Sequence, residues 1–138
     1  MLPSGPTLRH ALVIGVDGAR FDLLGRDISR RSGPSAGPAS WVPVTAYREA
    51  ARAADLRVGR LLDAVRSRPG YQQEGRTTVV VTDHGHLDQG GHGGREPEVV
   101  TAWAAAAGPG IDPGGPPAVT RQEQIAPLVL AAPGPLGA

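Results

Sequence analysis

The sequence predicts an α/β fold in which a small, mostly parallel sheet is flanked by helices. Three observations support this prediction: two short runs rich in β-branched residues, a long amphipathic segment between them, and an acidic residue directly after each run. Apolar runs that do not alternate with polar residues are typical of strands that a parallel sheet buries on both faces. The succession strand, helix, strand, strand, helix is typical of an α/β unit with a parallel component.

The predicted strands coincide with these runs. The first is expected over Ala11–Val16, before a turn that an Asp-Gly pair favours. The second is expected over Arg76–Thr82, where valine and threonine favour an extended backbone. A third is expected within Val99–Ala107, which ends before a Gly-Pro-Gly turn.

The clearest predicted helix begins near Thr45 and ends before a Pro-Gly pair. Its apolar residues recur with the spacing of one helical face, and we expect them to form part of the core. They are Tyr47, Ala50, Ala51, Ala54, Val58, Leu61, Leu62 and Val65. A weaker helical pattern covers residues 19–28. A short helix is expected over Arg121–Ala132, with Pro127 either in its first turn or breaking it.

Length and composition indicate one domain and loops rich in glycine and proline. The chain has 138 residues, so we expect a single domain over residues 1–138 with one core. The 20 glycines and 14 prolines concentrate in Gly33–Pro43, Gly108–Pro117 and Pro133–Gly137. We interpret these segments as loops, with residues 133–138 as a frayed tail.

Composition also excludes several kinds of function. The 14 basic and 13 acidic residues leave a net charge of +1, which argues against nucleic acid or a membrane surface as the partner. There is no cysteine, so neither a disulfide nor a thiolate metal site can form. No apolar run reaches the ~18 residues of a membrane helix, and we expect a cytoplasmic protein.

Residues of the kinds that bind metals follow the first two predicted strands. Asp17 follows the first strand, and Asp83 and His84 follow the second. In open α/β sheets, ligands bind at the carboxyl ends of the strands, so we expect these three side chains to meet. Carboxylate oxygen and imidazole nitrogen suit zinc or another borderline divalent ion. A lone Asp-Gly pair is more often a plain turn, so the prediction depends on the whole group.

The loop after the second strand contributes two further histidines. His92 stands between two pairs of glycines, which permit tight turns and a close approach to an ion, and we interpret it as a metal ligand. His86 is a candidate partner that orients a ligand; the alternative is an ordinary loop residue. Asp88 is expected to be a turn residue. Arg20 and Arg95 are expected to be surface cations, with contact to an anionic substrate as the alternative.

Five segments resemble, in order, parts of the alkaline phosphatase superfamily, in its branch of type I phosphodiesterases and nucleotide pyrophosphatases. They are VIGVDGARFDLL, YREAARAADLRVGRLLDAV, VVVTDHGHLDQGGHGG, AGPGI and RQEQIAPLVLAA. Together they span most of the chain, from about Ala11 to Ala132. Asp-His-Gly followed by His-Gly-Gly is a fairly specific mark of this family.

The resemblance implies a hydrolase that acts on small-molecule phosphate esters with two zinc ions. One zinc would be held by Asp17, Asp83 and His84. The other would be held by His92 together with an aspartate and a histidine from a middle motif. A threonine or serine nucleophile would bridge the two ions, which would activate it and hold the phosphate oxygens during displacement.

The segment between Asp17 and Tyr47 is much shorter than its counterpart in the family. Residues 26–44 are predicted to form a loop that replaces the family's middle segment, and no hydroxyl there aligns with the nucleophile. We therefore expect one well-formed zinc site instead of two. The leading hypothesis is an incomplete zinc-dependent hydrolase of phosphate esters. The alternatives are a metal-binding remnant without activity and a relative of the sulfatases or phosphomutases.

The same shortening has a consequence for association. Strands that neighbour the first strand in the family would be missing here. The apolar side chains of Leu12–Val16 would then be exposed at a sheet edge. Exposed edges of this kind pair readily with other chains, so either marginal stability or self-association is expected.

Overall fold

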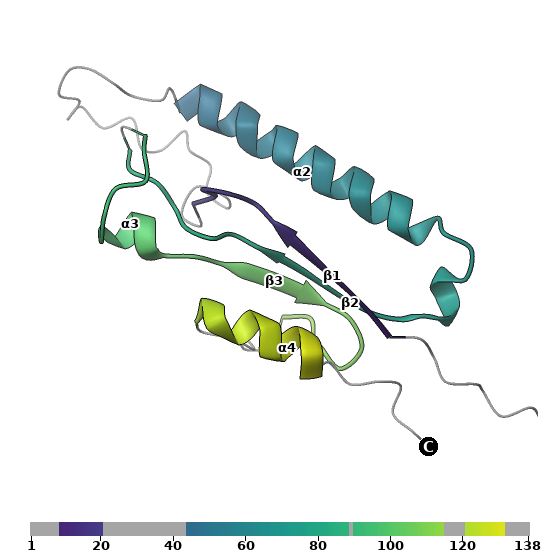
Figure 1. Cartoon of the computed structure of the whole chain (residues 1–138). Coiled ribbons are helices and arrows are strands. Elements are labelled where there is room, and N and C mark those ends of the chain that lie inside the picture. Colours follow the sequence, from purple (N-terminus) through teal and green to yellow (C-terminus); the bar gives the residue numbers. More distant parts are fainter. Residues whose placement is uncertain (1–8, 21–43, 89, 115–120, 132–138) are drawn as a thin grey trace, which may run out of the picture. The chain divides into compact units, whose positions relative to one another are not determined.

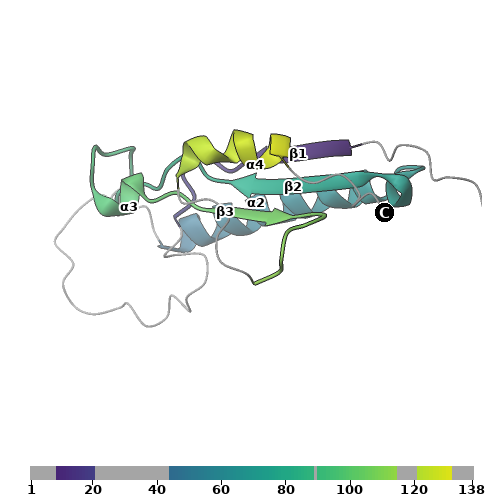
Figure 2. The ribbon, with the colours of Figure 1, turned by 90° about the horizontal axis from the view of Figure 1, so that it is seen from below.

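Three strands form one mixed sheet in a small α/β fold (Figure 1). The computed structural model describes residues 9–20, 44–88, 90–114 and 121–131. β1 (Arg9–Gly15) pairs in parallel with β2 (Gly75–Val81), and β2 pairs antiparallel with β3 (Ala104–Ala107). β2 is thus the middle strand, and Figure 2 shows it alongside β3. The α/β class and the three predicted strands are confirmed.

β3 runs against the other two strands, so the prediction of a mostly parallel sheet is wrong in this part. Val81 at the end of β2 is the register partner of Ala104 at the start of β3, so the intervening loop leaves and re-enters the sheet at one end. The N–H of Thr82 donates to the carbonyl of Trp103 across 3.0 Å at this point. A parallel strand would require a crossover to the other end. The described part of the loop contains one short helix, α3 (Pro97–Val100), which includes the point where the third strand was expected to begin.

β1 is an edge strand of the described sheet, and it is less buried than predicted. Its residues alternate between exposed and half-buried, and Val13 is 49% exposed. The prediction of burial on both faces is therefore wrong for β1, which has one neighbouring strand where β2 has two. In β2, Thr77 and Val79 are buried. The exposed apolar edge of β1 is the feature on which the prediction of self-association rests.

α2 (Val44–Arg66) confirms the long predicted helix. Ala50 and Leu61 of its apolar face are exposed, and the other members of that face are half-buried. The chain turns at the expected Pro-Gly pair, where Gly70 adopts a φ of 85° that favours glycine. The short 3-10 helix η2 (Tyr71–Gln73) follows.

The C-terminal helix α4 (Ile125–Ala131) follows the 3-10 helix η3 (Gln122–Gln124). Pro127 lies in the first turn of α4, where a missing N–H leaves no helical hydrogen bond unmade. This settles the choice between a first-turn proline and a break in the helix. None of the described helices is long and apolar enough to cross a membrane.

Contacts divide the chain into two compact units. The sheet unit consists of Met1–Gly15, Gly59–Val81 and Ala104–Ala138. The loop unit consists of Val16–Val58 and Thr82–Trp103, and it contains every predicted metal ligand. The weak helical pattern beyond Arg20, the predicted loop up to Pro43 and the predicted C-terminal tail lie outside the described residues.

A polar network surrounds Glu74 in the sheet unit, directly before β2. The Glu74 carboxylate, 10% exposed, accepts hydrogen bonds from Arg76 and, at 2.8 Å, from Arg68. Nε2 of His10 lies 3.7 Å from the same carboxylate. The hydrogen bond from Arg76 holds the pKa of Glu74 below its ordinary value of 4.5. Burial opposes this effect, and the charges of Arg68 and His10 add to it.

Candidate metal centre

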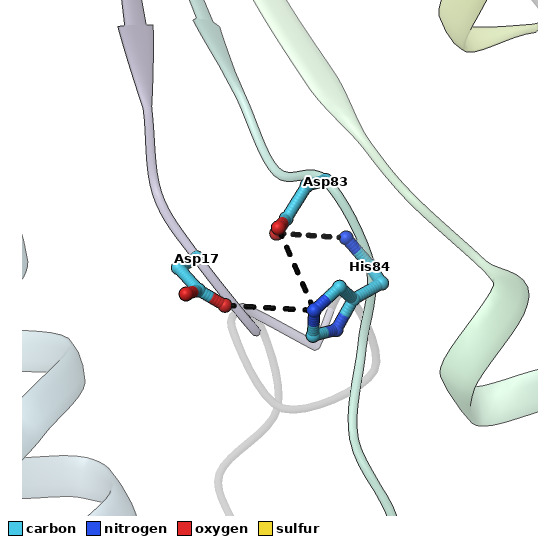
Figure 3. A group of neighbouring side chains, drawn as sticks. All are labelled: Asp17, Asp83 and His84. Atoms are coloured by element: carbon cyan, nitrogen blue, oxygen red, sulfur yellow. Dashed lines mark hydrogen bonds and ion pairs between the residues drawn. The ribbon is translucent and has the colours of Figure 1, made fainter. Parts of the chain in front are cut away.

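Asp17, Asp83 and His84 come together in the loop unit (Figure 3). Nε2 of His84 lies 3.6 Å from Oδ1 of Asp17 and 3.5 Å from Oδ2 of Asp83. One ligand atom from each of the three side chains lies within 4.8 Å of the others. This is the group expected from two parallel strands that end together, and β1 and β2 do end at register partners, Gly15 and Val81.

Thr82 and Asp83 join the two turns that carry the ligands. Oγ1 of the buried Thr82 accepts a hydrogen bond from the N–H of Ala19 (3.1 Å) and donates to the carbonyl of His84 (2.9 Å). Oδ1 of Asp83 accepts from the N–H groups of Gly18 (3.2 Å) and His84 (2.9 Å). Gly18 has a φ of 63°, a conformation that favours glycine. These bonds position the ligands without requiring an ion.

The ring of His84 is oriented to bind through Nε2. Its Nδ1 lies 2.5 Å from the carbonyl oxygen of Gly85, which only accepts, so Nδ1 carries the proton. In the neutral ring, Nε2 then presents its lone pair on the side of the two carboxylates, an arrangement common among metal-binding histidines. The pKa of His84 is raised above its ordinary value of 6.5, mainly by the hydrogen bond to Gly85. Burial opposes this, and the charges of Asp83 and Asp17 reinforce it.

Asp83 is held in its ionised form. Partial burial raises the pKa of its carboxyl, but the hydrogen bonds from Gly18 and His84 outweigh burial. The pKa of Asp83 therefore lies below its ordinary value of 3.8. A carboxylate that stays ionised does not need to lose a proton before it binds a metal ion.

The distances from Nε2 of His84 to the two carboxylates are close to what zinc requires. In a tetrahedral site with bonds of about 2.0–2.1 Å, two ligand atoms lie roughly 3.3 Å apart. The 3.6 and 3.5 Å between His84 and the two carboxylates approach this value. Two carboxylate oxygens and one imidazole nitrogen also form a ligand set that zinc accepts. Three protein ligands leave one position for a further ligand or a substrate.

His92 lies beside His84 but outside this group of three. The centroids of the two rings are 4.8 Å apart and the ring planes are inclined by 57°. His92 is exposed, and Gly91 and Gly93 on either side have φ values of 86° and 60°. The loop thus contains the glycine turns expected from the sequence. Among the described residues, no second group of three potential metal ligands is present around His92.

His86 makes contacts of another kind. Its ring packs against Tyr47, with centroids 4.9 Å apart. Its Nδ1 lies 2.7 Å from the carbonyl oxygen of Leu87. These side-chain contacts do not involve Asp17, Asp83 or His84, so the suggestion that His86 orients a ligand gains no support from the described residues.

Arg20 is a residue whose role the sequence did not reveal. Its side chain is 7% exposed, so the expectation of a surface cation is wrong. Nη1 donates to Oδ1 of Asp88 at 2.5 Å and to the carbonyl of His86 at 3.2 Å. The backbone N–H of Arg20 donates to the Tyr47 hydroxyl at 2.9 Å. Arg20 and Asp88 are 68 positions apart, and no local pattern marks them as partners.

No protein-family model, curated protein or solved structure matches this chain. The resemblance to the alkaline phosphatase superfamily therefore rests on the sequence motifs alone. The geometry of Asp17, Asp83 and His84 is a separate observation that does not depend on that resemblance.

Proposed function

We propose that this chain binds a divalent metal ion, preferentially zinc, through Asp17, Asp83 and His84. With this ion bound, it would hydrolyse small-molecule phosphate esters. The observation that carries the proposal is the position of Nε2 of His84, which faces two carboxylate oxygens at nearly tetrahedral spacing. The motifs shared with phosphodiesterases and nucleotide pyrophosphatases support a phosphate ester as the substrate.

The residues of the site have distinct tasks in this proposal. Asp17, Asp83 and His84 would hold the ion, while Gly85 and Gly18 keep His84 and Asp83 in position. The bound metal would supply Lewis-acid polarisation of a phosphoryl oxygen. The side chains of Asp17 and Asp83 are 82% and 54% exposed, so a small substrate can reach the site from solvent.

The attacking group is not Thr82. Thr82 is completely buried, and its hydroxyl is already hydrogen-bonded to Ala19 and His84. The hydroxyl of Thr101 is likewise already hydrogen-bonded, because it donates to the carbonyl of Pro97 at 2.6 Å. The hydroxyl candidates from the shortened segment, whose side chains lie outside the described residues, are Ser29, Ser32, Ser35, Ser40 and Thr45. Attack by one of these hydroxyls or by water is consistent with the proposal.

A metal-binding protein without turnover is the second candidate. It is favoured because Thr82, whose hydroxyl joins the two ligand turns, is buried and cannot reach a substrate. The third candidate is a sulfatase or phosphomutase relative, which would share the ligand arrangement and differ in substrate.

Hydrolysis assays separate these candidates. The metal-stripped chain is reconstituted with zinc and given a p-nitrophenyl phosphodiester, the corresponding phosphomonoester and a sulfate ester. We expect zinc-dependent turnover, fastest on the phosphodiester and largely lost in Asp83→Asn. Asp55→Asn removes an exposed carboxylate from α2 and serves as the matched control, with unchanged turnover. Equal turnover in Asp83→Asn and the unmodified chain would contradict the proposal, and zinc binding without turnover would favour the second candidate.

A further inference from the structure

The rings of His92 and His84 are spaced as two imidazoles on one ion would be. In a tetrahedral zinc site, the centroid of a bound imidazole lies about 3.2 Å from the ion, so two such centroids are roughly 5 Å apart. The centroids of His84 and His92 are 4.8 Å apart. The spacing of the two rings therefore suits a pair that binds one ion. In this structure, the ligand atoms of His92 lie outside the group formed by Asp17, Asp83 and His84.

The two carboxylates that flank His92 among the described residues of the loop, Asp88 and Glu96, are already engaged. Asp88 and Glu96 lie in the same loop, on either side of His92. Asp88 is paired with Arg20 at 2.5 Å. An oxygen of Glu96 accepts the N–H of Gly94 at 2.6 Å, and this hydrogen bond lowers the pKa of Glu96. Both carboxylates thus have partners other than a metal ion.

His92 can turn toward the group of three at little cost. It is exposed, and within the described part of the chain its ring contacts His84 without a hydrogen bond or an ion pair that would hold it. Gly91, directly before His92, has a φ of 86° and open space around it, so the side chain of His92 is not crowded on that side. A ring rotation therefore breaks no strong interaction among the described residues.

We propose that His92 is the fourth ligand of one metal ion held by Asp17, Asp83 and His84. This inference rests on the proposed function, because it requires the three-ligand site to bind metal. With four protein ligands the resting site is closed, and a phosphate ester must displace His92 to reach the ion. His92 would then be an exchangeable ligand that controls access of the substrate.

X-ray absorption of the zinc-loaded chain tests this ligand set, because it counts imidazole ligands. We expect one zinc per chain with two imidazoles, and one imidazole in His92→Ala. His86→Ala is the matched control from the same loop, with the count of two retained because this ring packs on Tyr47. Competitive titration should show zinc affinity at least ~10-fold lower in His92→Ala, with the stoichiometry of one unchanged.

The outcomes separate the two proposals. One imidazole in the unmodified chain, or two zinc ions of which His92→Ala loses one, would overturn the role of His92. In both cases, a loss of zinc binding in His84→Ala would still support the site formed by Asp17, Asp83 and His84. If the unmodified chain binds no zinc, or if His84→Ala binds it equally well, the metal site itself is refuted, together with the role of His92.

Discussion

Nη1 of Arg20 lies 2.5 Å from Oδ1 of Asp88, and this ion pair joins the segment after β1 to the loop after β2. The Arg20 side chain is 7% exposed and that of Asp88 is 71% exposed. A guanidinium buried to this extent requires partners, and Asp88 and the carbonyl of His86 provide them. The pair therefore stabilises the loop that carries His84 and is not positioned to bind an anionic substrate.

Arg20→Met should destabilise the metal-free chain. The substitution keeps an apolar stem and removes the hydrogen bonds to Asp88 and His86. We expect the free energy of unfolding in urea to fall by about 1–3 kcal/mol. Arg57→Met replaces an exposed cation on α2 and should change the free energy of unfolding little. Equal stability of the two variants would show that the Arg20–Asp88 pair does not support the loop.

Gly85→Ala and Gly59→Ala should have opposite effects on stability. A Cβ at Gly85 would lie 1.8 Å from the carbonyl oxygen of Glu98, so the backbone must move. We expect a loss of at least about 1–3 kcal/mol. At Gly59, inside α2, a Cβ meets nothing within 4 Å, and alanine should stabilise the helix by about 1 kcal/mol. Thermal melts of both variants check the two signs, and a neutral Gly85→Ala would contradict the close approach.

The Glu74 network should make the sheet unit sensitive to acid. The folded-state pKa of Glu74 lies below its ordinary value of 4.5 because of the hydrogen bond from Arg76. Its contribution to stability is therefore complete above about pH 4.5 and is lost as the pH falls through the lower folded-state pKa. Urea midpoints between pH 7 and pH 3 should fall less steeply for Glu74→Gln than for Glu49→Gln, an exposed control on α2. Parallel curves for the two variants would show that Glu74 does not contribute to the acid sensitivity.

Asp17 and Asp83 should differ in their effect on the metal-free fold. Asp17 is 82% exposed and faces His84, so Asp17→Ala should weaken zinc binding and leave the thermal midpoint unchanged. Asp83 also accepts hydrogen bonds from Gly18 and His84, so Asp83→Ala should in addition destabilise the metal-free chain by about 1 kcal/mol. Asp83→Asn retains an acceptor oxygen and should recover most of that stability without recovering zinc affinity. Identical melting of all three variants would contradict this division of roles.

Local patterns in the sequence were sufficient for β1, β2 and α2, because strand propensity and helical spacing depend on near neighbours. They were also sufficient to predict the group of Asp17, Asp83 and His84, since these residues follow two paired parallel strands that end at register partners. They failed for the direction of β3. That direction depends on the end of the sheet to which the loop returns, which no short segment encodes.

Partnerships over long distances in the chain were also beyond the sequence. Arg20 was expected to be a surface cation because its acceptor, Asp88, lies in the loop after a different strand. Thr82 was expected to be part of a strand, yet its hydroxyl joins the two turns of the candidate site. Such contacts become visible only when the positions of both segments are known.

Calorimetric titration of zinc into the metal-stripped chain shows whether Asp17, Asp83 and His84 form a metal site. We expect one zinc ion bound per chain, and loss of that binding in His84→Ala, because Nε2 of His84 faces both carboxylates. Absence of binding by the unmodified chain, or equal binding by His84→Ala, would contradict this expectation.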